Sequence, residues 1–218
     1  KDMIYGGADF IKEDEIMANN SYLPLETRVE AIEHLKQISG WKGFYAYCIN
    51  ADPLELVDNC AAVKMGSNSE ASVGGVHINF WSGLGAYTTA RKYNLATHYQ
   101  RSGIRILTDP GNRYSLSWPV LVKLGCMAGI DSMHVGMLGG YYPEGESETE
   151  TLEAIKICAK YNVIPSLSCG MNPVLAREIK ERIGNNWMGS VGGWLHTGDG
   201  TKGNTLYHKV KEMSEAML

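Results

Sequence analysis

The feature that most constrains how this chain folds is the regular alternation of strand and helix patterns along its whole length. Seven short apolar segments are predicted to be strands, and each is followed by a segment with apolar residues at helical spacing. The predicted strands are 8–11, 44–49, 73–80, 95–100, 132–135, 163–168 and 187–191, and the predicted helices are 24–39, 53–65, 83–93, 117–128, 147–161, 173–183 and 204–217. Such alternation predicts a parallel sheet with right-handed crossovers.

Seven units in a row favour a closed (β/α)8 barrel over an open sheet. A barrel needs about 250 residues, and the chain has 218. The shortfall is about one strand–helix unit and falls at the start, where residues 1–7 resemble the end of a preceding helix and turn. We therefore predict an α/β fold: one domain over 1–218, with seven units of a TIM barrel and no first strand.

Composition excludes several classes of protein. The net charge is −4 with both signs interspersed, which is not typical of a nucleic-acid-binding surface. No apolar run is long enough to cross a membrane, and the first residues carry no signal-peptide pattern. The five cysteines are odd in number and widely spaced, which favours reduced thiols and a cytoplasmic location.

In a barrel, the chemistry lies at the carboxyl ends of the strands. After the first predicted strand, alternation puts Lys12 and Asp14 on one side, with Glu15 just beyond. Two carboxylates suit a hard cation such as Mg²⁺, and Lys12 could join them only as a carbamate formed with CO2. The alternative is a charged loop without a metal.

Other strand ends carry groups suited to anions. Gly192 and Gly193 at the last strand, with Ser168 and Gly170 on the neighbouring one, could hold a phosphate through backbone N–H groups. The alternative is a glycine-rich turn. Arg101 is a candidate for binding a second phosphate or a carboxylate, and the alternative is a surface ion pair. His134 is a candidate for donating to a substrate oxygen or assisting proton transfer, and the alternative is a structural histidine. His77 and His98 are predicted to be wall residues.

The motifs together resemble the large-subunit superfamily of ribulose-1,5-bisphosphate carboxylase (RuBisCO). The run GGADFIKEDE, residues 6–15, is similar to the family signature Gly-Gly-x-Asp-Phe-x-Lys-Asp-Asp-Glu, and the resemblance continues through GIDSMHVG, PSLSCG and the Gly192–Gly193 pair. It implies that Mg²⁺ is held by carbamylated Lys12 with Asp14 and Glu15. It also implies one phosphate on Ser168, Gly170, Gly192 and Gly193, another on Arg101, and His134 in contact with substrate.

Three departures separate this chain from the carboxylase. Gln100 stands where the carboxylase has a histidine, Tyr141 where a loop lysine reaches the added CO2, and Cys169 where the family has a glycine. This pattern is similar to the RuBisCO-like proteins (form IV), which resemble the carboxylase but enolise or isomerise other sugar phosphates.

The resemblance implies Mg²⁺-dependent enolisation or isomerisation of a phosphorylated ketose, with the Lys12 carbamate or His134 as the base. Alternatives are RuBisCO carboxylation, decarboxylation of a 3-oxo sugar-acid phosphate, and a non-catalytic barrel subunit. The family's N-terminal α+β domain and first strand fall outside these residues, and could come from a second chain. The family also implies a homo-oligomer built on dimers.

Overall fold

The computed structural model describes residues 1–18, 20–67, 74–139 and 147–218. By their internal contacts, these residues form two compact units. The N unit comprises Asp9–Arg105 and Leu124–Ser132, and the C unit comprises Lys1–Ala8, Ile106–Lys123 and Met133–Leu218. Each unit is described by itself.

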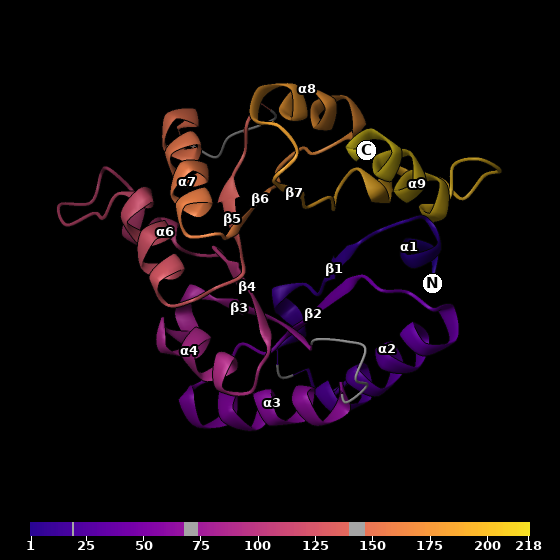
Figure 1. Ribbon diagram of the computed structural model, residues 1–218, viewed down its shortest axis with the longest axis horizontal. Helices are drawn as coiled ribbons and strands as arrows, with labels where there is room; N and C mark the ends of the chain where they lie inside the picture. The colour runs from indigo at the N-terminus through magenta and orange to yellow at the C-terminus, as the bar shows by residue number, and fades with distance from the viewer. Residues whose placement is uncertain (19, 68–73, 140–146) are drawn as a thin grey trace. The chain divides into compact units, whose positions relative to one another are not determined.

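The N unit contains four parallel strands that neighbour one another in chain order. They are β1 (Phe10–Lys12), β2 (Phe44–Cys48), β3 (Gly75–Asn79) and β4 (Ala96–Gln100). The helices between them are α2 (Leu25–Ser39), α3 (Pro53–Gly66) and α4 (Gly85–Lys92), with 3-10 turns η1 (Glu15–Met17) and η2 (Phe80–Ser82). The three helices lie along one side of the strands (Figure 1).

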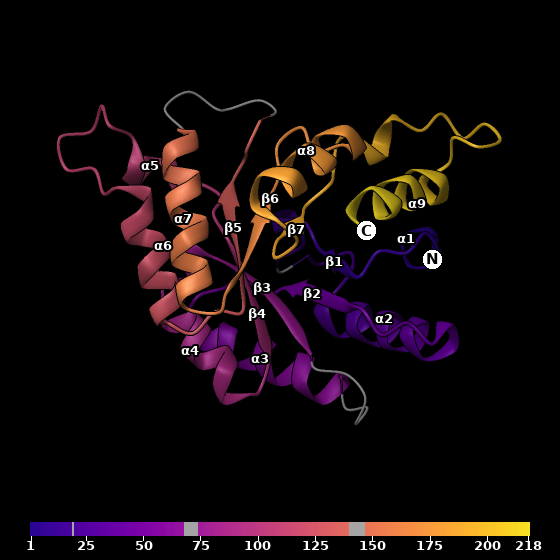
Figure 2. The same ribbon diagram turned by 45° about the horizontal axis from the view of Figure 1, so that its top comes forward.

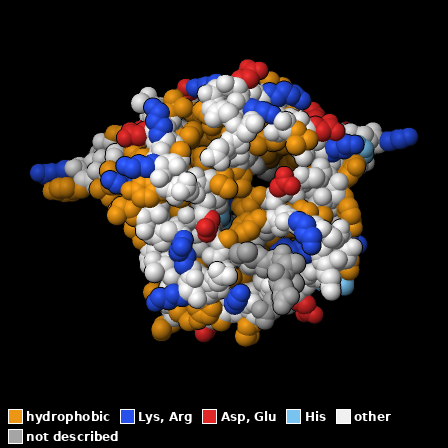
Figure 3. All heavy atoms as spheres, viewed as in Figure 1, with side chains coloured by type: hydrophobic (Ala, Val, Ile, Leu, Met, Phe, Trp, Pro, Cys, Tyr) orange, Lys and Arg blue, Asp and Glu red, His pale blue; other side chains and the backbone are white. Residues whose placement is uncertain are grey.

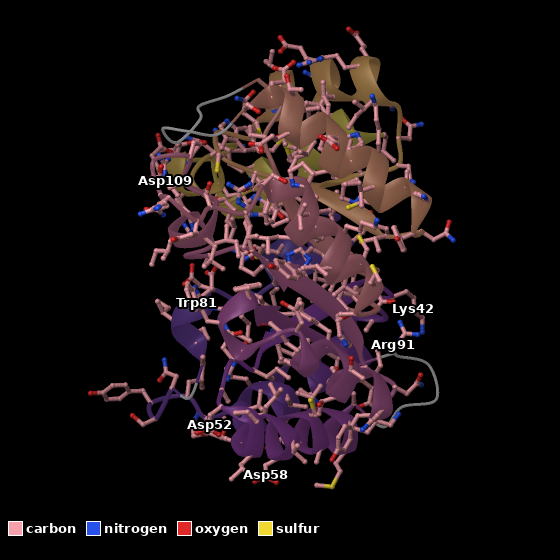
Figure 4. The ribbon with its side chains drawn as sticks, turned by 90° about the vertical axis from the view of Figure 1, so that its left-hand side faces the viewer. Lys42, Asp52, Asp58, Trp81, Arg91 and Asp109 are labelled. Atoms are coloured by element: carbon pink, nitrogen blue, oxygen red, sulfur yellow. The ribbon has the colours of Figure 1, made fainter. Side chains whose placement is uncertain are left out.

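Helix ends in this unit follow signals in the sequence. Asp52 accepts a hydrogen bond from the backbone N of Glu55 at 3.3 Å and Pro53 occupies the first turn, so α3 begins there. Gly40 ends α2 in the left-handed conformation, with φ of 67°. In Figure 4, Asp52 and Trp81, which follow β2 and β3, lie toward one end of the unit and Arg91, which precedes β4, lies toward the other. The strands therefore direct their carboxyl ends toward Asp52 and Trp81.

The two faces of this sheet differ in chemistry. On the face toward the helices, Tyr99 stacks on Tyr87 of α4 with ring centroids 5.2 Å apart, and the Tyr47 hydroxyl donates to Glu33 of α2 at 3.2 Å. On the opposite face, Phe10 packs against Phe44 at 5.5 Å. The register places these residues on that face: Phe10, Lys12, Ala46, Cys48, Gly75, His77, His98 and Gln100.

The C unit contains β5 (Ser132–Gly136), β6 (Ile164–Leu167) and β7 (Met188–Gly189), again in chain order. Its helices are α1 (Asp2–Tyr5), α5 (Arg105–Thr108), α7 (Glu148–Lys160), α8 (Pro173–Ile183) and α9 (Leu206–Met217), with the 3-10 turn η3 (Leu195–Thr197). Helix α6 (Trp118–Met127) is shared between the units, with its last four residues in the N unit. The first residue of α5 and the first residue of β5 also belong to the N unit. Helix α9 lies between α8 and α1 (Figure 2). The Ser214 hydroxyl donates to the Gly7 carbonyl at 3.1 Å, which ties the last helix to the first.

The predicted order of strands and helices is confirmed, and Ser147, the first residue of the predicted helix 147–161, is the N-cap of α7 and accepts from the Glu150 backbone N at 3.1 Å. Two details differ. Helix α5 was not predicted, because Arg105–Thr108 is only one turn long. The last strand is two residues rather than five, because only Ser166–Leu167 of β6 pairs with it.

The described surface agrees with the charge pattern of the sequence. Lys and Arg side chains are scattered among Asp and Glu on the face shown in Figure 3. No helix in the described ranges is long and apolar enough to span a membrane. All five cysteines have free thiols.

Candidate functional site

The loop after β1 carries the first predicted cluster. Lys12 is the last residue of the strand and half-buried, and its Nζ donates to the backbone O of Glu13 at 3.2 Å. Asp14 is exposed, and its Oδ1 accepts from the backbone N of Ile16 at 3.1 Å, which starts the turn η1. The sequence therefore brings an amine and a carboxylate together within three residues, at the end of a strand.

Glu13 has a different role from its neighbours. Its side chain is buried against α2, where Arg28 forms an ion pair with Oε2. The backbone N of Cys48 donates to Oε2 at 2.7 Å and the Tyr45 hydroxyl donates to Oε1 at 3.2 Å. Burial raises the pKa of Glu13, although these donors and the charge of Arg28 oppose the rise. Glu13 therefore anchors the loop.

Glu15 is held as a carboxylate by Gln100, the last residue of β4, and by Ser102, two residues beyond it. The Gln100 amide Nε2 and the Ser102 hydroxyl both donate to its Oε1. Burial acts to raise the pKa of Glu15, but the hydrogen bond from Ser102, then the charge of Lys12 and the Gln100 donor, lower it to about 2. Glu15 is consequently an anion at neutral pH, and both donors occupy the same oxygen.

A buried histidine lies beside this cluster. His77 on β3 is fully buried, and its Nδ1 donates to the backbone O of Glu13 at 3.1 Å. Its pKa is lowered to about 4, first by burial and then by the charge of Lys12, while Glu15 and Asp14 act in the opposite direction. Lys12, Asp14 and Glu15 therefore all lie within electrostatic reach of one imidazole. His77 and His98 are confirmed as buried wall residues.

The residue types fit a hard divalent cation if Lys12 is modified. Asp14 and Glu15 supply carboxylate oxygens, and Glu15 is held ionised. An ammonium group is no ligand, but a carbamate would give Lys12 an anionic oxygen. Within the described ranges, no cluster of three or more His, Cys, Asp or Glu is placed to hold a metal ion. A carbamate on Lys12 would add a third anionic ligand to these two carboxylates.

Arg101 follows β4 directly and is half-buried. Because side chains alternate along a strand, the Arg101 side chain lies on the opposite side from Gln100, which is the side of Tyr99. Burial raises the pKa of Tyr99, and the positive charge of Arg101 acts to lower it. The structure thus places Arg101 next to the residues that hold Glu15.

The C unit brings together two predicted residues from neighbouring strands. His134 lies inside β5, two residues before its end, and Ser168 follows β6 directly. The Ser168 hydroxyl and the His134 Nε2 form a hydrogen bond. Cys169 has φ of 73° and Gly170 has φ of 82°. The left-handed conformation costs a non-glycine residue about 1–2 kcal/mol, which explains why a glycine suits position 169 better.

Gly192 and Gly193 lie between β7 and η3, not at the strand end as predicted. A Cβ built at either glycine would meet no atom within 4 Å among the described residues. The backbone N of Ser190 donates to the Leu167 carbonyl at 2.8 Å, and Ser190 also contacts Ser166 through their hydroxyls at 2.6 Å. The loops after β6 and β7 are therefore neighbours, and both glycines face open space.

Some functional partners were missed in the sequence. The sequence indicates Gln100 only as the loss of an imidazole and gives no role to Ser102. Their position at the end of a strand and two residues beyond it was the available signal. Tyr141, where the carboxylase has its loop lysine, lies outside the described residues.

The order of strands and helices, with polar groups after the strands, defines an α/β protein of the TIM-barrel class. Residues 1–200 match the family "Ribulose bisphosphate carboxylase large chain, catalytic domain". The chain belongs to this family.

Individual relatives agree with this assignment. A 3-oxo-isoapionate-4-phosphate decarboxylase of Rhizobium rhizogenes is 34% identical over 164 residues, which cover 71% of this chain and 37% of the relative. A RuBisCO-like protein from Burkholderia fungorum has a TM-score of 0.82 at 23% identity, over 99% of this chain and 54% of the other. A dimeric archaeal RuBisCO from Hyperthermus butylicus has a TM-score of 0.79 at 22% identity, with coverage of 99% and 54%. The chain thus spans about half or less of these proteins, and the solved structures confirm the predicted fold class.

Proposed function

We propose that this protein binds Mg²⁺ and enolises or isomerises a phosphorylated ketose, with Lys12 as a carbamate beside Asp14 and Glu15. One observation carries the proposal: in a member of the RuBisCO family, the Glu15 carboxylate is held ionised by Gln100 and Ser102 next to Lys12. Bound Mg²⁺ supplies a Lewis acid that stabilises negative charge on a carbonyl oxygen during removal of the adjacent proton.

The chain offers two groups that can take that proton. His134 Nε2 is hydrogen-bonded to the Ser168 hydroxyl, so the imidazole is oriented and can exchange a proton through Ser168. A carbamate oxygen on Lys12 is the other candidate. Glu15 is unsuited to this task because its lowered pKa makes it a weak base.

The phosphate ends of the substrate are assigned to two places. We propose that Ser168, Gly170, Gly192 and Gly193 hold one phosphate and that Arg101 holds the other. The open space beside both glycines supports the first assignment, because backbone N–H groups there can be approached closely. A guanidinium suits the second, because its donors match phosphate oxygens.

Gly192→Val tests the first phosphate site. The added side chain meets no described protein atom at its Cβ, so stability should change little, whereas it would occupy the space of a phosphate. Losing two charge-assisted hydrogen bonds should weaken binding of a sugar phosphate about a hundredfold or more. Isothermal titration with ribulose 1,5-bisphosphate and a urea unfolding curve measure the two effects. Gly184→Val is the control for the added side chain, because Gly184 also faces open space but lies at the end of α8. Its φ of 78° means that the valine lowers the stability of this variant somewhat.

Decarboxylation of a 3-oxo sugar-acid phosphate is the second candidate. It is favoured by the 34% identity to a 3-oxo-isoapionate-4-phosphate decarboxylase and uses the same stabilisation of charge beside a carbonyl. Carboxylation is less favoured, because Gln100 offers an amide to Glu15 where the carboxylase has an imidazole.

Solvent isotope exchange tests the proposed function. We expect the protein with Mg²⁺ and bicarbonate to exchange deuterium from D2O into the carbon beside the ketone of a ketose phosphate, followed by mass spectrometry. Release of CO2 from a 3-oxo acid phosphate without such exchange would favour the decarboxylase. Incorporation of labelled CO2 into ribulose 1,5-bisphosphate product would instead identify a carboxylase.

We further propose a homo-oligomer built on dimers, as in the archaeal RuBisCO named above as dimeric. Native mass spectrometry, compared with the denatured mass, measures the number of chains and shows whether a second polypeptide supplies further residues. Equal native and denatured masses would contradict this assembly.

A further inference from the structure

Trp81 contacts the residue that holds Glu15. It lies in η2, directly after β3, and its indole Nε1 donates to the backbone O of Ser102 at 3.1 Å. The hydroxyl of the same Ser102 donates to the Glu15 carboxylate. Ser102 therefore connects an indole in the loop after β3, labelled in Figure 4, to a proposed metal ligand in the loop after β1.

The turn that carries Ser102 is closed by its own backbone. The backbone N of Ile104 donates to the carbonyl of Arg101 at 3.0 Å, and Gly103, the third residue of this turn, has φ of 73°. Ser102, the second residue, does not have a positive φ, and this pattern is typical of a type II turn. The Ser102 carbonyl takes no part in closing the turn and accepts from Trp81 instead.

Glycine at position 103 also permits the close approach of the indole. A Cβ built on Gly103 would lie 2.5 Å from the Trp81 Nε1, closer than such contacts occur in proteins. At its backbone, Trp81 donates from N to the Asn79 Oδ1 at 3.0 Å, and its ring packs edge-on against Phe80 with centroids 5.9 Å apart. Trp81 is nevertheless 54% exposed. Contacts at particular atoms, rather than burial, therefore hold the ring against the turn.

The donors to Glu15 depend on the position of this turn. The Gln100 Nε2 and the Ser102 hydroxyl both donate to the Glu15 Oε1, and the Gln100 Nε2 also donates to the Ser102 Oγ at 3.2 Å. Donors that converge on one oxygen fix the direction in which a carboxylate faces. Hydrogen bonds of this kind orient metal ligands, and their loss weakens metal binding.

We propose that Trp81 is a positioning residue for the metal site: its indole N–H holds the Ser102 carbonyl, which directs the Ser102 hydroxyl to Glu15 and so orients that carboxylate for Mg²⁺. This inference rests on the proposed function. The indole acts through two hydrogen bonds in series. Its effect on Mg²⁺ binding should therefore be smaller than that of the Ser102 hydroxyl, and should disappear when the hydroxyl is absent.

A double-mutant cycle on Mg²⁺ affinity tests this coupling. Trp81→Phe keeps an aromatic ring but removes the indole N–H, and Ser102→Ala removes the hydroxyl. With bicarbonate present, we expect Ser102→Ala to weaken Mg²⁺ binding about tenfold, as for loss of a hydrogen bond to a metal ligand. Trp81→Phe should weaken it about three- to fivefold when Ser102 is present, and less than about 1.5-fold in the Ser102→Ala background. Isothermal titration measures all four proteins.

Trp187→Phe is the matched control. The Trp187 Nε1 donates to the Gly184 carbonyl at 3.0 Å, so this change removes the same kind of hydrogen bond, but in the C unit, whereas Glu15 lies in the N unit. It should leave the Mg²⁺ affinity unchanged. An unchanged affinity in Ser102→Ala, or a Trp81→Phe effect that is equal in both backgrounds or absent from both, overturns this inference alone. Failure of the unsubstituted protein to bind Mg²⁺ overturns the proposed metal site, and the inference with it.

A second measurement covers a Ser102→Ala protein that does not fold. 1H–15N spectra resolve the indole N–H of each tryptophan, and the Trp81 resonance is identified by its absence from Trp81→Phe, whose other indole resonances show that it is folded. With bicarbonate present, we expect the Trp81 resonance to move when Mg²⁺ is added and the Trp187 resonance to stay. A Trp81 resonance that does not respond to Mg²⁺ contradicts the proposal.

Discussion

Lys12→Ala is expected to weaken Mg²⁺ binding about a hundredfold or more and to abolish its dependence on bicarbonate. Even loss of a residue that only supports a metal ligand typically costs 10–100-fold in affinity, and this change removes a proposed ligand. Without Lys12, only the carboxylates of Asp14 and Glu15 remain as proposed ligands. One oxygen of Glu15 already accepts hydrogen bonds from Gln100 and Ser102. Titration of Mg²⁺ with and without bicarbonate, followed calorimetrically, measures the effect.

Lys42→Ala provides the control for this experiment. Lys42 is exposed in the loop before β2 and is labelled in Figure 4. It should bind Mg²⁺ as the unsubstituted protein does. Bicarbonate-independent Mg²⁺ binding that survives in Lys12→Ala would contradict the carbamate, and assembly without any uptake of metal would support the non-catalytic subunit.

The order of elements could be predicted from the sequence because each element obeys a local rule. Alternating apolar residues indicate strands, and signals such as Asp52 before Pro53 or Gly40 after α2 mark helix ends. Strand ends were less predictable. β7 is short because pairing with a neighbour, not the apolar run from Trp187 to Val191, decides where a ladder ends.

The site was predicted only as far as short-range spacing allowed. Alternation predicted Lys12 and Asp14 on one side, and the side chain of Glu13 between them is paired with Arg28 of α2. The partners of Glu15 lie 85 and 87 residues further along the chain, so no local pattern could indicate them. The contact of His134 with Ser168 spans 34 residues and follows from the neighbouring strands β5 and β6.

Arg28→Ala is expected to destabilise the fold by about 3–5 kcal/mol, since removing one partner of a buried ion pair leaves the other charge uncompensated. Arg28 and Glu13 are each 4% exposed, and Arg28 also donates to the carbonyls of Leu23 and Met17 at 3.1 Å. Arg182→Ala is the control. Its ion pair with Glu148 is more than 40% exposed on both sides, so its loss should cost at most about 1 kcal/mol. Urea unfolding measures both variants.

The pH dependence of the Arg28→Ala variant distinguishes an unpaired carboxylate from lost packing. Burial raises the pKa of Glu13 even with Arg28 present, and removing the cation raises it further. The folded state then binds a proton that the unfolded state releases, so stability falls as pH rises through the window between the ordinary glutamate pKa and the raised one. The deficit should therefore be smaller at pH 5 than at pH 8. A deficit independent of pH would mean that the contacts of Arg28 with Leu23 and Met17, rather than its charge, hold the loop in which Lys12 and Asp14 lie.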